Sequence, residues 1–153
     1  MPLGDSITEI TCWREYLWQH LAEAQLTGKV NFVGSKNDTW HSCTMDVPGF
    51  DRSHEGHRGW TASKVVDYLQ KWLWSAATPD VVQFMLGTND IYQGRTSNEI
   101  LDSYTSLIHI MRKTNPKMKI IVSGRQIIFI TRLIHRRLTS LFPYLRINPT
   151  YGF

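Results

Sequence analysis

The sequence predicts an α/β fold in which a parallel β-sheet is covered by helices on both faces. Four segments typical of strands alternate along the chain with three segments whose apolar residues have helical spacing. The length of 153 residues is that of one domain, so one hydrophobic core is expected.

The first half is expected to contain two strands and one helix. Residues 1–3 indicate the end of a strand that runs into a turn at 4–6, where a glycine permits a close bend. Residues 12–24 have apolar side chains three and four positions apart, which predicts an amphipathic helix that Gly28 ends. The alternating segment 29–34 predicts a short strand.

Residues 35–60 lack periodicity and predict a long loop, and regular structure resumes after it. Helical spacing returns at 61–74, and an apolar run at 81–86 predicts a buried parallel strand. A third helix is expected from 97 to about 115, where Asn-Pro ends it, and 119–122 starts a fourth strand.

Two polar residues directly follow predicted strands. Ser6 follows the first strand, and Asn89 lies in the GTND sequence after the buried strand. Because ligands of such sheets bind beyond the carboxyl ends of the strands, we expect both residues at one edge. Acyl transfer needs a nucleophile and donors for an oxyanion; Ser6 could supply the first, and the Asn89 amide with the N–H groups of Ser6 and Gly59 could supply the second.

Three sequence blocks together resemble a known family. They are GDSIT at 4–8, HEGHRG at 54–59 and GTND at 87–90. In this order and spacing they are similar to the SGNH (GDSL-type) hydrolases. The longer stretches MPLGDSITEITCW, FVGS, GFDRSHEGHRGWTA and FMLGTNDI resemble, more narrowly, carbohydrate esterase family 3, the acetyl xylan esterases. The resemblance covers residues 1–122.

The resemblance implies a three-layer, flavodoxin-like α/β/α sandwich whose C-terminal part is incomplete. It implies that Ser6 is the nucleophile and that Ser6, Gly59 and Asn89 form the oxyanion hole. It further implies a secreted, cofactor-free and metal-free enzyme acting on acetyl esters of xylan-type polysaccharide or small esters. The residues alone leave open whether Cys12 and Cys43 form a disulfide or remain thiols, and the resemblance favours the disulfide.

The general base of the family does not match this sequence. In the family it is a histidine in an Asp-x-x-His motif near the C-terminus, but no Asp or Glu follows Asp102 here. His135 has Arg132 at the position of the aspartate, which would disfavour an imidazolium, so His135 is a weak candidate. The general base is therefore unknown, and impaired activity is expected.

The charge distribution divides the chain unevenly. Through Asp102 there are 8 basic and 13 acidic residues, whereas 9 basic and no acidic residues follow. We assign 1–122 to a partial SGNH hydrolase domain and 123–153 to an atypical basic tail, and we hypothesise that this tail is non-native sequence such as a translated intron. The start also reads as incomplete, with no signal peptide, and no apolar run suits a membrane span. We expect a monomer without nucleic-acid or membrane partners.

Other interpretations of these residues stay open. His54 and His57 could be hydrogen-bonding residues or, with Trp60, line a substrate cleft, and either histidine could be a weak base; Trp40 is a further substrate candidate. The HEGH sequence does not have the spacing of the zinc motif HExxH. Alternative functions are a lipid-directed SGNH hydrolase, such as a lysophospholipase or thioesterase, and a non-catalytic carbohydrate-binding remnant.

Overall fold

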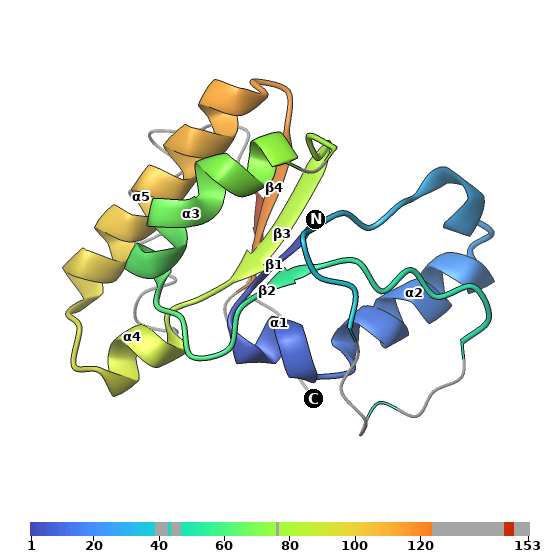
Figure 1. Cartoon of the computed structure of the whole chain (residues 1–153), viewed down its shortest axis with the longest axis horizontal. Helices are drawn as coiled ribbons and strands as arrows, with labels where there is room; N and C mark the ends of the chain where they lie inside the picture. Colours follow the sequence, from blue (N-terminus) through green and yellow to red (C-terminus); the bar gives the residue numbers. More distant parts are fainter. Residues whose placement is uncertain (39–42, 44–46, 76, 124–145, 149–153) are drawn as a thin grey trace.

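The computed structural model describes residues 1–38, 43, 47–75, 77–123 and 146–148. Within these residues five strands form one sheet in the order β2-β1-β3-β4-β5, and every neighbouring pair is parallel (Figure 1). The strands are β1 (Pro2–Gly4), β2 (Glu55–Gly56), β3 (Val81–Met85), β4 (Lys119–Ser123) and β5 (Arg146–Asn148).

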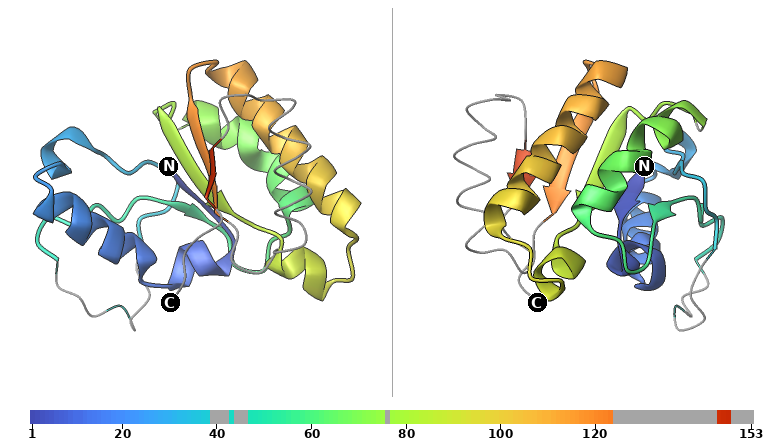
Figure 2. Two further views of the ribbon diagram at one scale, coloured as in Figure 1. Left: turned by 180° about the vertical axis from the view of Figure 1, so that it is seen from behind. Right: turned by 60° about the vertical axis from the view of Figure 1, so that its left-hand side comes forward.

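Helices lie on both faces of the sheet, which confirms the α/β fold class and the layered architecture. The helices are α1 (Ser6–Ile10), α2 (Trp13–Glu23), the 3₁₀ turn η1 (Thr27–Lys29), α3 (Ala62–Ser75), α4 (Thr88–Tyr92) and α5 (Ser97–Thr114). The long helices α3 and α5 pack together over one face, and α2 lies on the other side (Figures 1 and 2). None of the helices that the structure describes has the length and apolar character to cross a membrane.

The core lies between the sheet and the helices α3 and α5. Alternate strand residues point into it: Leu3, Val82, Phe84, Ile120 and Val122. The apolar stripes of the two helices meet them: Ala62, Val65, Leu69, Trp72, Leu73, Ile100, Leu101, Tyr104, Leu107, Ile108 and Met111. Each buried Val, Leu, Ile, Phe or Met side chain among them stabilises the fold by about 1.5–3 kcal/mol, so this layer anchors the strands whose ends carry the polar residues.

The strand predicted at 29–34 is wrong. Residues 27–29 form η1, and no strand is assigned at 30–34. The alternation has another cause, because the Phe32 ring packs edge-on against Trp18 with centroids 5.4 Å apart. The Phe32 N–H donates to the Asp51 carboxylate at 2.7 Å rather than to a strand. The second parallel strand is instead β2, which lies inside the predicted loop.

The three long helices are confirmed, with small differences at their ends. Helix α2 ends at Glu23, before Gly28, since Gln25 already has a left-handed backbone with φ of 57°. Helix α5 begins at the N-cap Thr96, whose side chain and that of Glu99 form a capping box. The short helices α1 and α4 were not predicted, because five residues are too few for a periodic signal.

The segment assigned to a basic tail contains the strand β5. β5 pairs with β4 through Ile121 and Arg146, Val122 and Ile147, and Ser123 and Asn148. The proposed boundary after residue 122 therefore falls inside β4. Residues 124–145 and 149–153 lie outside the described residues.

Candidate active site

Ser6 lies at the carboxyl end of β1, as the first residue of α1. The turn before it requires a glycine, because a Cβ on Gly4 would lie 2.2 Å from Thr8 Oγ1 and 2.7 Å from the Met85 carbonyl oxygen. Ser6 is partly exposed. Among the residues that the structure describes, no histidine or carboxylate bonds to its hydroxyl.

Asp5 links the start of α1 to the opposite side of the site. Its carboxylate is fully buried and accepts the Ile7 N–H at Oδ1, 2.9 Å away, as the N-cap of α1. Its other oxygen accepts from Asn89 Nδ2 at 3.4 Å. Burial raises the pKa of Asp5, hydrogen bonds from the backbone oppose this, and the neighbouring Asp90 raises it further.

Asn89 lies in α4, directly beyond β3. In Figure 1, α1 and α4 both lie at the lower end of the sheet, where the strand arrows point. The Asn89 amide also donates to the Trp60 carbonyl oxygen at 2.9 Å. The expectation that Ser6 and Asn89 share one sheet edge is confirmed, since Asn89 contacts the residue before Ser6. Three segments far apart in sequence therefore meet at this amide.

Gly59 directly precedes Trp60 in the loop between β2 and α3. Its φ of +78° is left-handed, a conformation in which other residues are strained, and the Trp60 N–H donates to the His57 carbonyl at 3.2 Å to close the turn. Gly59 thus directly precedes the residue whose carbonyl accepts from Asn89. Its role as an oxyanion donor stays a prediction.

His54 is a buried hydrogen-bonding residue. Its side chain is 0% exposed, so it lines no open cleft. Nδ1 accepts the Gly56 N–H at 3.0 Å, and Nε2 lies 3.1 Å from the Asp38 carboxylate. Burial, followed by the charge of Arg14, lowers the pKa of His54, although Asp38 opposes this. The neutral ring with a proton on Nε2 satisfies both contacts.

His57 supports the loop through Trp60. Its Nε2 lies 2.6 Å from Glu55 Oε1, and its ring stacks on Trp60 and Trp72 at centroid distances of 4.5 and 4.3 Å. Burial favours the neutral form of Glu55, but hydrogen bonds from His57 and Ser35 hold the pKa of its carboxyl below the usual value. The contacts of His57 therefore lead to the loop and the core rather than to Ser6.

Three other candidates from the sequence are the Cys12–Cys43 disulfide, His135 and Trp40. Cys12 and Cys43 are joined in a disulfide that ties the start of α2 to the long loop. His135 and Trp40 lie outside the described residues. Among the residues that the structure covers, no group of three or more His, Cys, Asp or Glu side chains could hold a metal ion.

Arg14 is a site-supporting residue that the sequence reasoning missed. Its guanidinium is buried and donates to four backbone carbonyls: Thr8 at 2.9 Å, Glu9 at 3.1 Å, Arg52 at 2.9 Å and Asp38 at 3.2 Å. Burial lowers the pKa of Arg14, and nearby carboxylates oppose this. The residue thereby joins helix α1, which begins at Ser6, to two loops. No local motif signals this, because its loop partners are 24 and 38 positions away.

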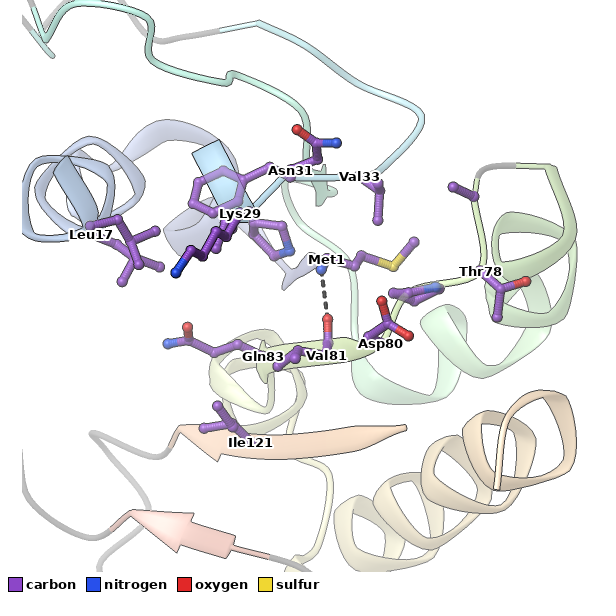
Figure 3. A pocket seen from close by; sticks show the side chains of 16 residues that line it. Met1, Leu17, Lys29, Asn31, Val33, Thr78, Asp80, Val81, Gln83 and Ile121 are labelled. Atoms are coloured by element: carbon purple, nitrogen blue, oxygen red, sulfur yellow. Dashed lines mark hydrogen bonds between the residues drawn. The ribbon is translucent and has the colours of Figure 1, made fainter. Parts of the chain in front are cut away.

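A pocket of about 530 Å³ lies elsewhere, between α2 and the sheet face turned away from α3 and α5 (Figure 3). Gln83 and Ile121 reach it from the sheet and Leu17 from α2. Asp80 and Thr78, which precede β3, place it at the amino ends of the strands. It is therefore at the opposite end of the sheet from Ser6 and Asn89.

Comparison with known proteins gives consistent matches. A model described as the GDSL-like Lipase/Acylhydrolase family matches residues 3–150. Among solved structures, a carbohydrate esterase family 3 protein from Talaromyces cellulolyticus is 48% identical with a TM-score of 0.77, over 80% of this chain and 59% of that one. Among curated proteins, none is significantly similar.

Two further solved structures cover more of the chain. An acetyl esterase mutant, solved with acetate ion, is 38% identical with a TM-score of 0.85, over 96% of this chain and 75% of that one. A family 3 carbohydrate esterase from Clostridium thermocellum is 25% identical with a TM-score of 0.75, over the same shares. The chain thus spans 59–75% of the length of these three proteins.

Proposed function

The chain belongs to the GDSL-like lipase/acylhydrolase family, and from this premise we propose that its site is that of a serine esterase acting through Ser6. The observation that carries the proposal is the pair of hydrogen bonds from Asn89. They bring the Ser6 turn, the Gly59 loop and α4 to one point beyond the strand ends.

In the proposed reaction the Ser6 hydroxyl oxygen attacks the ester carbonyl carbon and gives its proton to a base. The resulting oxyanion accepts from the N–H groups of Ser6 and Gly59 and from the Asn89 amide. Collapse of this intermediate breaks the bond to the alcohol, which leaves with a proton. Water then hydrolyses the acyl-serine to the acid and restores Ser6.

The Asn89 amide has two hydrogens, and both have protein partners in this structure. The bond to the Trp60 carbonyl is short at 2.9 Å, whereas the contact with the Asp5 carboxylate is long at 3.4 Å. We assign the second hydrogen to the oxyanion, because giving up the long contact costs little. The first bond would meanwhile hold the amide in place.

The substrate we propose is an acetyl ester of a xylan-type polysaccharide. Support comes from the three similar structures, which are named carbohydrate esterases of family 3 or an acetyl esterase. The disulfide between Cys12 and Cys43 supports a secreted protein, since such bonds persist in oxidising compartments. Comparison of acetyl with long-chain nitrophenyl esters tests this choice, and preference for the long chain would favour a lipid-directed hydrolase.

We further propose that the base is the weak element of this chain. No Asp or Glu follows Asp102, and neither His54 nor His57 bonds to Ser6. Without a base, binding and the oxyanion hole alone would leave about a thousandfold acceleration over water. Added imidazole, a diffusible base, should then increase the rate severalfold.

The test measures release of nitrophenol from nitrophenyl acetate, with and without imidazole, by the wild type and by Ser6→Ala. After subtraction of the hydrolysis that imidazole catalyses without protein, we expect slow hydrolysis that imidazole enhances and that Ser6→Ala abolishes, with acetyl-Ser6 detected by mass spectrometry. Hydrolysis that persists in Ser6→Ala would contradict the proposal. Retained polysaccharide binding in that case would favour a non-catalytic carbohydrate-binding protein.

A further inference from the structure

Asp90 is a buried carboxylate beside the site that the proposed reaction does not use. It follows Asn89 in α4, and only 2% of it is exposed. Its Oδ2 accepts the N–H of Ala62 at 2.8 Å, across 28 residues of sequence. Ala62 is the first residue of α3, so this N–H has no partner within the helix.

The Asp90 bond and the Asn89 bond act on the same short segment. Asn89 donates to the carbonyl of Trp60, and Asp90 accepts from the N–H of Ala62. One bond holds the carbonyl of Trp60 and the other holds the N–H of Ala62, two residues later. Together they restrain the backbone conformation of residues 60–62. Gly59 immediately precedes this segment.

Gly59 needs such support because the space that a side chain would occupy at this position is empty. A Cβ at Gly59 would meet no atom within 4 Å, and its φ of +78° belongs to a residue with wide backbone freedom. An oxyanion donor must be held within about 0.5 Å of its productive position. The aim of the Gly59 N–H therefore depends on its neighbours.

Below the loop, the Trp60 ring rests on His57, which the buried Glu55 holds. This contact restrains the Trp60 side chain, whereas Asp90 restrains the backbone on the far side of Trp60. The burial of a carboxylate is costly unless it is paired or hydrogen-bonded, and the pKa of Asp90 is raised chiefly by this burial. The hydrogen bond from the Ala62 N–H offsets part of the cost of burying this carboxyl group.

We propose that Asp90 is a positioning residue for the oxyanion hole: through the Ala62 N–H it fixes the loop 59–62 so that the Gly59 N–H points at the oxyanion. This inference rests on the esterase function proposed above for Ser6. It differs from a role in α3 capping alone, because capping would affect stability without changing the chemistry at Ser6.

The variants are Asp90→Ala, which removes the acceptor, and Asp90→Asn, which keeps an acceptor oxygen of the same reach. Asp51→Ala and Asp51→Asn are matched controls, since Asp51 also accepts a backbone N–H, that of Phe32, but in another loop. The first readout is the rate at which a fluorophosphonate labels Ser6, followed by intact-mass spectrometry. The second is amide hydrogen exchange at Gly59 and Trp60, which do not bond to Asp90.

We expect Asp90→Ala to be labelled between tenfold and a hundredfold more slowly, approaching the loss of one oxyanion donor. Asp90→Asn and both Asp51 variants should stay within about threefold of the wild type by the same measure. Exchange at Gly59 and Trp60 should be faster in Asp90→Ala only. If Asp90→Ala does not fold, Asp90→Ser, whose hydroxyl is too short to replace the carboxyl, takes its place with the same expectation.

Labelling of folded Asp90→Ala at the wild-type rate would overturn the inference, as would unchanged exchange at Gly59 and Trp60. Equal slowing in the Asp51 variants would also overturn it, because the effect would then be one of general stability. If the wild type is not labelled at Ser6 even with added imidazole, the esterase proposal fails. The exchange data then decide by themselves whether Asp90 positions the loop.

Discussion

Replacement of Arg14 by Met should destabilise the protein by about 2–4 kcal/mol. The guanidinium donates to four carbonyls, of which those of Arg52 and Asp38 belong to exposed residues and can recover water. The Thr8 and Glu9 carbonyls lie deeper, and each buried group left unpaired costs about 1–3 kcal/mol. Relief of the buried charge offsets part of the resulting sum.

The assay is equilibrium urea unfolding followed by far-ultraviolet circular dichroism. Arg52→Met is the matched control, because the Arg52 side chain is exposed and we expect a change within about 0.5 kcal/mol. Arg14→Lys should lie between the two, since an ammonium reaches fewer carbonyls than the guanidinium fork. An Arg14→Met protein as stable as Arg52→Met would refute the argument that these carbonyls depend on Arg14.

Three other predictions address the site and the loops around it. Asn89→Ala removes the donor shared by Trp60 and Asp5, so Ser6-dependent ester hydrolysis should fall about a hundredfold, measured as initial rates on nitrophenyl acetate; a loss below threefold would contradict its role. Joint replacement of Cys12 and Cys43 by Ala opens a loop spanning 31 residues and should lower the free energy of unfolding in urea by about 3–4 kcal/mol relative to the oxidised wild type. The reduced wild type should be as unstable as this variant, and an unchanged stability of the variant would contradict the prediction. Burial and the charge of Arg14 lower the pKa of His54 below 6.5, so below about pH 6.5 the unfolded chain binds more protons than the folded chain and the free energy of unfolding should fall with the pH. Urea unfolding at several pH values should show a shallower fall for His54→Gln than for the wild type. The same dependence on pH in both proteins would exclude His54 as the cause.

The sheet edge could be predicted from sequence because the signal is local. A buried apolar run that ends in GTND places Asn89 beyond a strand, and the GDS turn does the same for Ser6. The strand β2 could not be predicted in this way. It has only two residues, and one of them, Glu55, is a fully buried carboxylate that reads as exposed loop.

The supporting bonds were missed for a different reason. Arg14 and Asp90 act on backbone groups of residues distant in sequence, and a backbone acceptor or donor has no identity that a motif can record. The alternation of apolar residues at 29–34 predicted a strand that does not form, because Phe32 is buried by Trp18 rather than by a sheet. The periodicity of apolar residues indicates which side chains are buried, but a segment forms a strand only where a neighbouring strand pairs with it.

In the described part of the site, hydrogen bonds hold the proposed oxyanion donors in place. The Ser6 turn, the Gly59 loop and α4 are joined by the side chains of Asp5, Asn89 and Asp90. Within the part of the chain that the structure describes, no base for Ser6 contributes to these bonds. We therefore expect added imidazole to act on Ser6 without disturbing the bonds that hold the proposed oxyanion donors.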